Sequence, residues 1–266
     1  MGHAGTVPRI VLDVDPGLWF LLLPRRRRPR FEVDVPVSDT VGHVVRMVGI
    51  PPTEVGALHL DGRPVDLAVR PTARTGSDVA GRPPVLWIGP RGRPHATRRH
   101  PPRFLLDVHL RALAHRLRLL GLDAAWEPDA DDAHLVERAA AEERVLLTRD
   151  RGLLHRGALP EGALVRGERA DDQLADVLDR FRPTLAPWTR CLRCGAALAG
   201  ASAADVAEQL LPRTRGAYRQ FSRCTGCGQV YWRGAHAGRL DAVVGRARQV
   251  LDAAHPHGGN GDDPMT

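Results

Sequence analysis

The sequence predicts an α/β protein with a doubly wound parallel sheet in its middle, a small mixed sheet before it and a cysteine module behind it. Three observations lead to this prediction. Short apolar runs alternate with helical apolar stripes between residues 103 and 181, a strand-rich pattern with one helix occupies residues 7–88, and two Cys-x-x-Cys-Gly motifs follow near the end. A chain of 266 residues is long enough for such parts to have their own cores.

The first module shows the two-residue alternation of strands around a single helix. Its expected elements are strands at 7–15 and 31–35, a helix over 41–48, a strand–turn–strand at 58–65 and a strand at 85–88. The run Arg25 to Arg28 predicts a basic hairpin loop, and Ser38 or Asp39 can cap the helix. One helix on a mixed sheet is a β-grasp, ubiquitin-like layout, which we assign to residues 6–90.

The second module begins after a Pro-, Gly- and Arg-rich stretch, residues 91–102, that predicts an exposed linker. Its expected elements are strands at 103–107, 123–126, 144–148 and 163–165, with helices over 110–120, 131–140 and 171–181. Strands that alternate with helices of this length form a parallel sheet with right-handed crossovers. We assign this module to residues 103–185.

Several carboxylates are expected at the carboxyl ends of the strands, where such a sheet binds ligands. Asp107 and Asp150 end or follow strands, and Asp131 or Asp132 begins a helix. Clustered carboxylates repel one another, so a cluster that stays ionised near neutral pH needs a cation, with Mg²⁺ or Mn²⁺ the natural candidates. Such a metal suits phosphodiester hydrolysis because it lowers the pKa of a bound water. The alternative is that these aspartates only cap helices and begin polar loops.

The cysteines form the strongest local motif. Two matched knuckles, each followed by glycine, predict a structural four-thiolate zinc ribbon over residues 186–245, rather than a disulfide or redox pair. The four ligands are Cys191, Cys194, Cys224 and Cys227. In the strand after the second knuckle, Tyr231 and Trp232 point to opposite faces, so one can pack on the ribbon while the other stacks on a base. Residues 246–266 are expected to be a mostly disordered tail.

Three segments, 104–107, 110–123 and 145–151, resemble the Mut-seven C-terminal ribonuclease family, a PIN-like group, and the resemblance spans about residues 103–240. It implies metal-binding carboxylates at Asp107 and Asp150, with Asp132 as the helix ligand and Asp131 as its alternative. Residues 31–88 resemble the ubiquitin-like domain that precedes this nuclease in some proteins. PIN-like domains often pair, which implies a possible homodimer.

The formal charge of +7 favours a polyanionic partner, although all 38 basic residues are arginine and coding bias explains part of this excess. The candidate substrate-binding residues are Arg116, Arg118, Thr148, Arg149, Trp232 and Arg233. The arginines can hold phosphate through two parallel hydrogen bonds, or they can simply line a solvated face.

The leading hypothesis is a metal-dependent endoribonuclease that acts on RNA. The alternative is a non-cleaving RNA-binding adaptor whose ubiquitin-like domain recruits a protein partner. A sulfur-carrier function is disfavoured because the first module continues into Gly89-Pro90-Arg91-Gly92 instead of ending in two free glycines. The sequence shows neither a membrane span nor a secretion signal, so we expect a cytoplasmic protein.

Overall fold

The computed structural model describes residues 7–72, 82–234 and 237–253. The chain divides into two compact units. The first unit combines residues 1–92 with 150–164, and the second combines 93–149 with 165–266. A short segment from the middle of the sequence therefore belongs to the same unit as the N-terminal module. Among the described residues, no helix combines the length and apolar character that crossing a bilayer requires.

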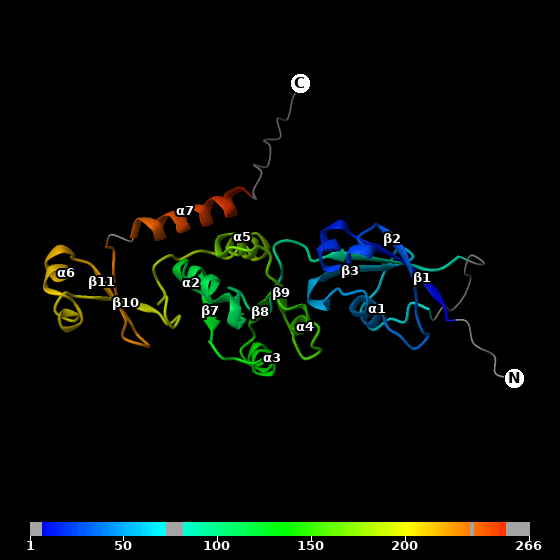
Figure 1. Cartoon of the computed structure of the whole chain (residues 1–266), viewed down its shortest axis with the longest axis horizontal. Helices are drawn as coiled ribbons and strands as arrows, with labels where there is room; N and C mark the ends of the chain where they lie inside the picture. The colour runs from blue at the N-terminus through cyan, green and yellow to red at the C-terminus, as the bar shows by residue number, and fades with distance from the viewer. Residues whose placement is uncertain (1–6, 73–81, 235–236, 254–266) are drawn as a thin grey trace, which may run out of the picture. The chain divides into compact units, whose positions relative to one another are not determined.

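The first unit contains a five-stranded mixed sheet, in the order β2-β1-β5-β3-β4, and one helix of two turns, α1 (Figure 1). Its elements in residues 1–92 are β1 Arg9–Val14, η1 Pro16–Leu21, η2 Pro24–Arg26, β2 Arg30–Asp34, α1 Val41–Met47, η3 Pro52–Glu54, β3 Val55–Leu60, β4 Arg63–Pro64 and β5 Val85–Pro90, and residues 150–164 add α4 Arg151–Leu154 and β9 Gly162–Leu164. Strand β1 pairs antiparallel with β2 and parallel with β5. This arrangement confirms the predicted β-grasp layout.

Local sequence explains these elements. Ile10, Leu12 and Val14 alternate along β1 and are at most 1% exposed, so one face of the strand lies in the core. Asp61 and Gly62, with φ of 48° and 79°, form the expected tight turn between β3 and β4. The prediction that Ser38 or Asp39 caps the helix is wrong. The cap is Thr40, whose hydroxyl accepts a hydrogen bond from the His43 N–H at 3.2 Å.

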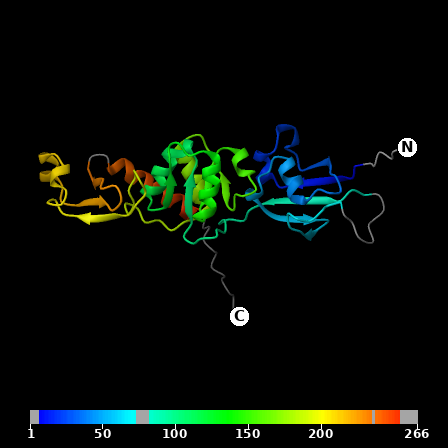
Figure 2. The same cartoon turned by 90° about the horizontal axis from the view of Figure 1, so that it is seen from below.

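The second unit has a parallel sheet at its centre, with β6 between β7 and β8. The strands are β6 Arg103–Leu106, β7 Asp123–Trp126 and β8 Val145–Thr148, and the helices are η4 Val108–Leu110, α2 Arg111–Leu119, α3 Asp132–Ala141 and α5 Ala170–Phe181. The green region of Figure 2 shows these helices beside the strands. Gly121 ends α2 with φ of 81°, and a Cβ there would lie 2.0 Å from the Ala186 oxygen, so this position requires glycine.

The cysteine module forms a three-stranded antiparallel sheet. It contains β10 Leu198–Ala201, η5 Ala207–Gln209, α6 Pro212–Ala217, β11 Phe221–Cys224 and β12 Val230–Trp232. A small core of Val206, Leu210, Phe221 and Val230 packs within it. With so few apolar side chains, the module needs a further source of stability, which the cysteines can supply.

Two segments differ from the prediction. Helix α7, Ala237–Ala253, occupies the start of the expected tail and packs beside α5, where Arg182 donates to the Leu251 oxygen at 2.7 Å (Figure 1). The rest of that tail lies outside the described residues. In the expected linker, His95 is only 8% exposed and packs its ring 5.2 Å from that of Phe181. The chain is therefore held against the second unit at this point.

Candidate functional site

Asp107 lies at the end of β6, beside the end of the parallel strand β8. Its carboxylate is 7% exposed, and its Oδ2 atom accepts a hydrogen bond of 2.6 Å from the hydroxyl of Thr148, which is fully buried. Among the described residues, no hydrogen bond reaches the other oxygen, Oδ1. Burying a carboxylate is costly unless it is paired or coordinates a metal. Asp107 thus offers a carboxylate oxygen of the kind that hard divalent cations bind.

The two aspartates before α3 have different roles in the structure. Asp131 is the N-cap, and its Oδ1 atom accepts a hydrogen bond from the His134 N–H at 2.8 Å. Asp132 is in the first turn of the helix. Both charges are favourable near a helix N-terminus. The capping bond gives Asp131 a local structural role, and both aspartates remain candidate ligands.

Asp150 belongs to the first unit, at the start of α4, Arg151–Leu154. It caps this short helix through a hydrogen bond of 2.7 Å from the Gly152 N–H to its Oδ1 atom. Arg151 donates to the backbone oxygens of Phe20 and Leu21 at 2.7 and 3.1 Å. The segment that begins with Asp150 is therefore attached to the β-grasp module.

The same segment has a second attachment at its other end. The Leu164 N–H, at the end of β9, Gly162–Leu164, donates to the Oε1 atom of Glu54 at 2.6 Å. Glu54 is 5% exposed, and the bond is buried. Sequence reasoning missed Glu54. Its partner stands 110 positions later in the chain, and no local pattern indicates such a contact.

Among the described residues, the expected carboxylates do not form a close group of potential metal ligands. Within the described ranges, the four cysteines are the group of potential ligands whose donor atoms lie within 4.8 Å of one another. Asp107, Asp131 and Asp132 belong to the second unit and Asp150 to the first. The joint carboxylate site thus remains a prediction.

The predicted phosphate-binding arginines already have protein partners. Arg116 pairs with Asp171, and this hydrogen bond lowers the pKa of the Asp171 carboxyl. Arg118 is 1% exposed and donates to the oxygens of Ala124, Leu192 and Arg193 at 2.8 to 3.1 Å. Arg118 therefore connects α2 to the first knuckle through hydrogen bonds. Arg149 is exposed and pairs with Glu168 at 2.9 Å, so it is the most accessible of the three.

The four cysteines fit a tetrahedral zinc ion. Their sulfur atoms lie 3.6 Å apart between Cys191 and Cys227 and 3.4 Å between Cys194 and Cys224. Zn–S bonds of about 2.3 Å in a tetrahedron place sulfurs about 3.8 Å apart. The sulfur atoms of Cys191 and Cys194 therefore face partners from the second knuckle at nearly the required spacing.

The pKa values of these thiols are also consistent with a bound cation. Burial opposes ionisation of Cys191, but hydrogen bonds from the Tyr231 hydroxyl and nearby backbone N–H groups lower the pKa of its thiol to about 6. Burial and the neighbouring thiols raise the pKa of Cys194 to about 12. Four thiolates this close repel one another, so a divalent cation is needed for all to ionise together.

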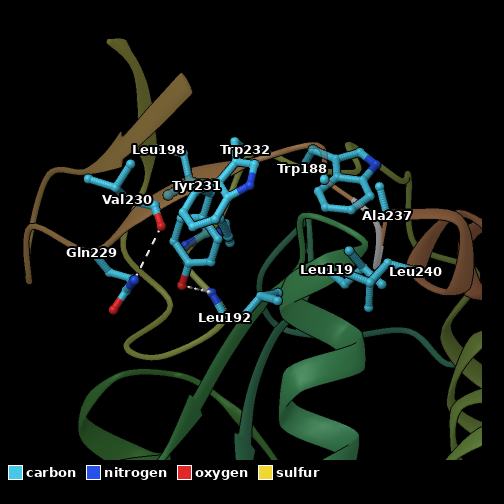
Figure 3. Close-up of a pocket in the computed structure, with 12 residues that line it drawn as sticks. Leu119, Trp188, Leu192, Leu198, Gln229, Val230, Tyr231, Trp232, Ala237 and Leu240 are labelled. Atoms are coloured by element: carbon cyan, nitrogen blue, oxygen red, sulfur yellow. Dashed lines mark hydrogen bonds between the residues drawn. The ribbon is translucent and has the colours of Figure 1, made fainter. Parts of the chain in front are cut away.

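The two aromatic residues of the strand after the second knuckle have different surroundings. The Tyr231 hydroxyl lies 3.1 Å from the Cys191 sulfur and accepts a bond from the Leu192 N–H at 3.1 Å, drawn as a dashed line in Figure 3. Trp232 is 40% exposed. Arg233 pairs with Asp241 and lies 5.0 Å above the ring of Trp188, a residue that sequence reasoning missed.

Comparison with known families identifies the chain. Family models match it in two places: the Mut7-C RNAse domain over residues 102–244 and the Mut7-C ubiquitin domain over residues 9–85. No curated protein and no solved structure matches. The fold and the matches define a ribonuclease-type protein with a ubiquitin-like module before the ribonuclease domain and a cysteine cluster within it. The chain belongs to the Mut7-C RNAse domain family, whose model covers more than half of it.

Proposed function

We propose that this protein is a metal-dependent endoribonuclease with a PIN-like sheet, and that Asp107, Asp150 and either Asp132 or Asp131 hold Mg²⁺ or Mn²⁺. The observation that supports this most is the match to a ribonuclease domain over residues 102–244, because that range contains every one of these carboxylates. The buried position of Asp107 beside Thr148 adds to it. Oxygen ligands of this type suit a hard divalent cation rather than zinc.

In this proposal, each protein group has a defined task. When bound, the divalent metal supplies a water of lowered pKa and neutralises charge that grows on the phosphate. Thr148 positions Asp107 by donating to one oxygen, so the other oxygen is oriented for ligation. Because Thr148 is fully buried, it acts through Asp107 rather than by contact with RNA.

The proposed RNA contacts are Arg149, Trp232 and Arg233, because all three are exposed. Arg118 is omitted because it is buried against backbone oxygens, and Arg116 because its side chain is less exposed than those of Arg149 and Arg233. The four cysteines hold a structural zinc ion in this proposal. Such a closed site adds folding energy and has no open position for substrate.

Cleavage of labelled single-stranded and hairpin RNA by the full chain tests this function. Zinc-loaded protein is incubated without added metal, with Mg²⁺ and with Mn²⁺. We expect cleavage inside the strand only when Mg²⁺ or Mn²⁺ is present. RNA that is bound but left intact under all conditions would refute the nuclease and support the adaptor with a protein partner for its ubiquitin-like domain.

A further inference from the structure

An aromatic-walled cavity of about 280 Å³ lies between the cysteine module and helices α2 and α7 (Figure 3). Trp188, Tyr231 and Trp232 contribute its aromatic surface, while Leu119 and Leu240 come from the helices. A second cavity of about 300 Å³ shares these three aromatic residues and adds Ser222 and Arg233. Because they share these three aromatic residues, the two cavities are neighbours, and we call them together the aromatic groove.

The fold alone does not account for this aromatic surface. Trp232 is one of the large apolar side chains that are exposed in the described part of the chain, at 40%. Trp188 has φ of 67°, a left-handed conformation that is unfavourable for a residue with a bulky side chain. Exposed aromatic area and local strain are typical of surfaces that bind a ligand.

The charge of the segment that carries the groove, residues 186–245, favours an anionic ligand. Residues 186–245 contain eight arginines and only three carboxylate residues. Arg193, Arg219, Arg223 and Arg239 are exposed on this part of the chain. Arg233, which also pairs with Asp241, lies 5.0 Å above the Trp188 ring, so a guanidinium group adjoins the aromatic wall directly. Flat aromatic faces with cations beside them are the features that proteins use for single-stranded nucleic acid.

We propose that Trp188, Tyr231 and Trp232 form a site for bases of single-stranded RNA, separate from the carboxylates that cleave it. Neighbouring bases occupy the two compartments by stacking on the shared rings, and the exposed arginines attract the phosphates between them. Stacking accepts every base, so this site tolerates different sequences and excludes duplexes, whose bases are already stacked. The inference rests on the proposed function only in taking RNA as the ligand. An apolar peptide is disfavoured because it would not use the excess of arginine over carboxylate residues in this segment.

Binding in the absence of added Mg²⁺ or Mn²⁺ separates this site from cleavage. The affinity of zinc-loaded full-length protein for a short fluorescein-labelled oligouridine is measured by anisotropy. Trp232→Ala is expected to weaken binding by about 5- to 150-fold, as for the loss of one stacked base, while Trp232→Phe retains most of the affinity. Leu211→Ala is the matched control, because Leu211 is 61% exposed in the same module but lines neither cavity.

The outcomes distinguish this site from the nuclease. Weaker binding by Trp232→Ala supports the base site even if the wild type never cleaves RNA. Equal affinity of wild type and Trp232→Ala, with unchanged zinc content, would overturn it even if the wild type is an active nuclease. Equal loss in Trp232→Phe and Trp232→Ala, or equal affinity for a duplex, would also contradict stacking. Trp188→Phe, which keeps an aromatic ring, gives a second check and is expected to bind like Trp232→Phe.

Discussion

Asp107→Asn is expected to lower the rate of Mn²⁺-dependent RNA cleavage by at least about 100-fold, the scale on which removal of one preorganised electrostatic group acts. The substitution keeps the size of the side chain and an oxygen that can accept the Thr148 hydrogen bond, but it removes the charge that would hold the metal. Initial cleavage rates over a series of Mn²⁺ concentrations measure the effect. The half-saturating Mn²⁺ concentration is expected to rise as well.

The matched control is Asp129→Asn, the same change of charge on an exposed loop of the same unit. It should cleave like the wild type. The melting temperature and zinc content of both variants show whether the fold is retained. If a folded Asp107→Asn variant cleaves RNA at the wild-type rate with the wild-type metal requirement, Asp107 is not a ligand and the proposed site is wrong.

Removal of zinc is expected to unfold the cysteine module. Its apolar core is small, and structural zinc contributes roughly 10 to 16 kcal/mol of apparent binding free energy in comparable peptides, more than such a core can replace. Cys194→Ser should therefore lose bound zinc and the protection of amide protons in β10, β11 and β12. Metal analysis and hydrogen exchange measure the two effects. The loss should extend to the end of α2, because Arg118 donates to oxygens of Leu192 and Arg193.

Thr225→Ser provides the control for this substitution. It changes a side chain in the second knuckle that is not a ligand and keeps the hydroxyl that donates to the Ala197 oxygen. Zinc content and amide protection should remain at the wild-type level. A Cys194→Ser variant with one tightly bound zinc and unchanged protection of the three strands would contradict the four-thiolate site.

Strong local patterns made much of the fold predictable. The alternation along β1, the Asp61-Gly62 turn and the buried runs of β6 and β8 each have one natural interpretation. Helix α7 was missed because its buried face is thin, with only Val243, Val244 and Ala247 buried. The stability of such a polar helix depends on contacts with neighbouring elements, which the local sequence does not reveal.

The contacts around the candidate site were less predictable than the residues themselves. Strand ends indicated Asp107 and Asp150, but not that Asp150 begins a segment held by the β-grasp module. Arg116 and Arg118 are the same residue type on the same predicted helix. In the structure, Arg116 pairs with Asp171, whereas Arg118 is buried under the first knuckle. These differences arise from partners far along the chain, so helical spacing alone could not separate a phosphate ligand from a structural arginine.

The chemistry of the cut ends tests the central claim most directly. Zinc-loaded wild-type protein cleaves a labelled RNA in Mn²⁺, and mass spectrometry identifies the termini. Hydrolysis by a metal-activated water predicts linear phosphate and hydroxyl ends, with cleavage that persists when the nucleotide at the cut lacks its 2′-hydroxyl. The contrary result is a 2′,3′-cyclic phosphate that forms without Mn²⁺ and is lost with the deoxy substitution. It would show that the RNA supplies its own nucleophile, which would contradict the carboxylate–metal mechanism.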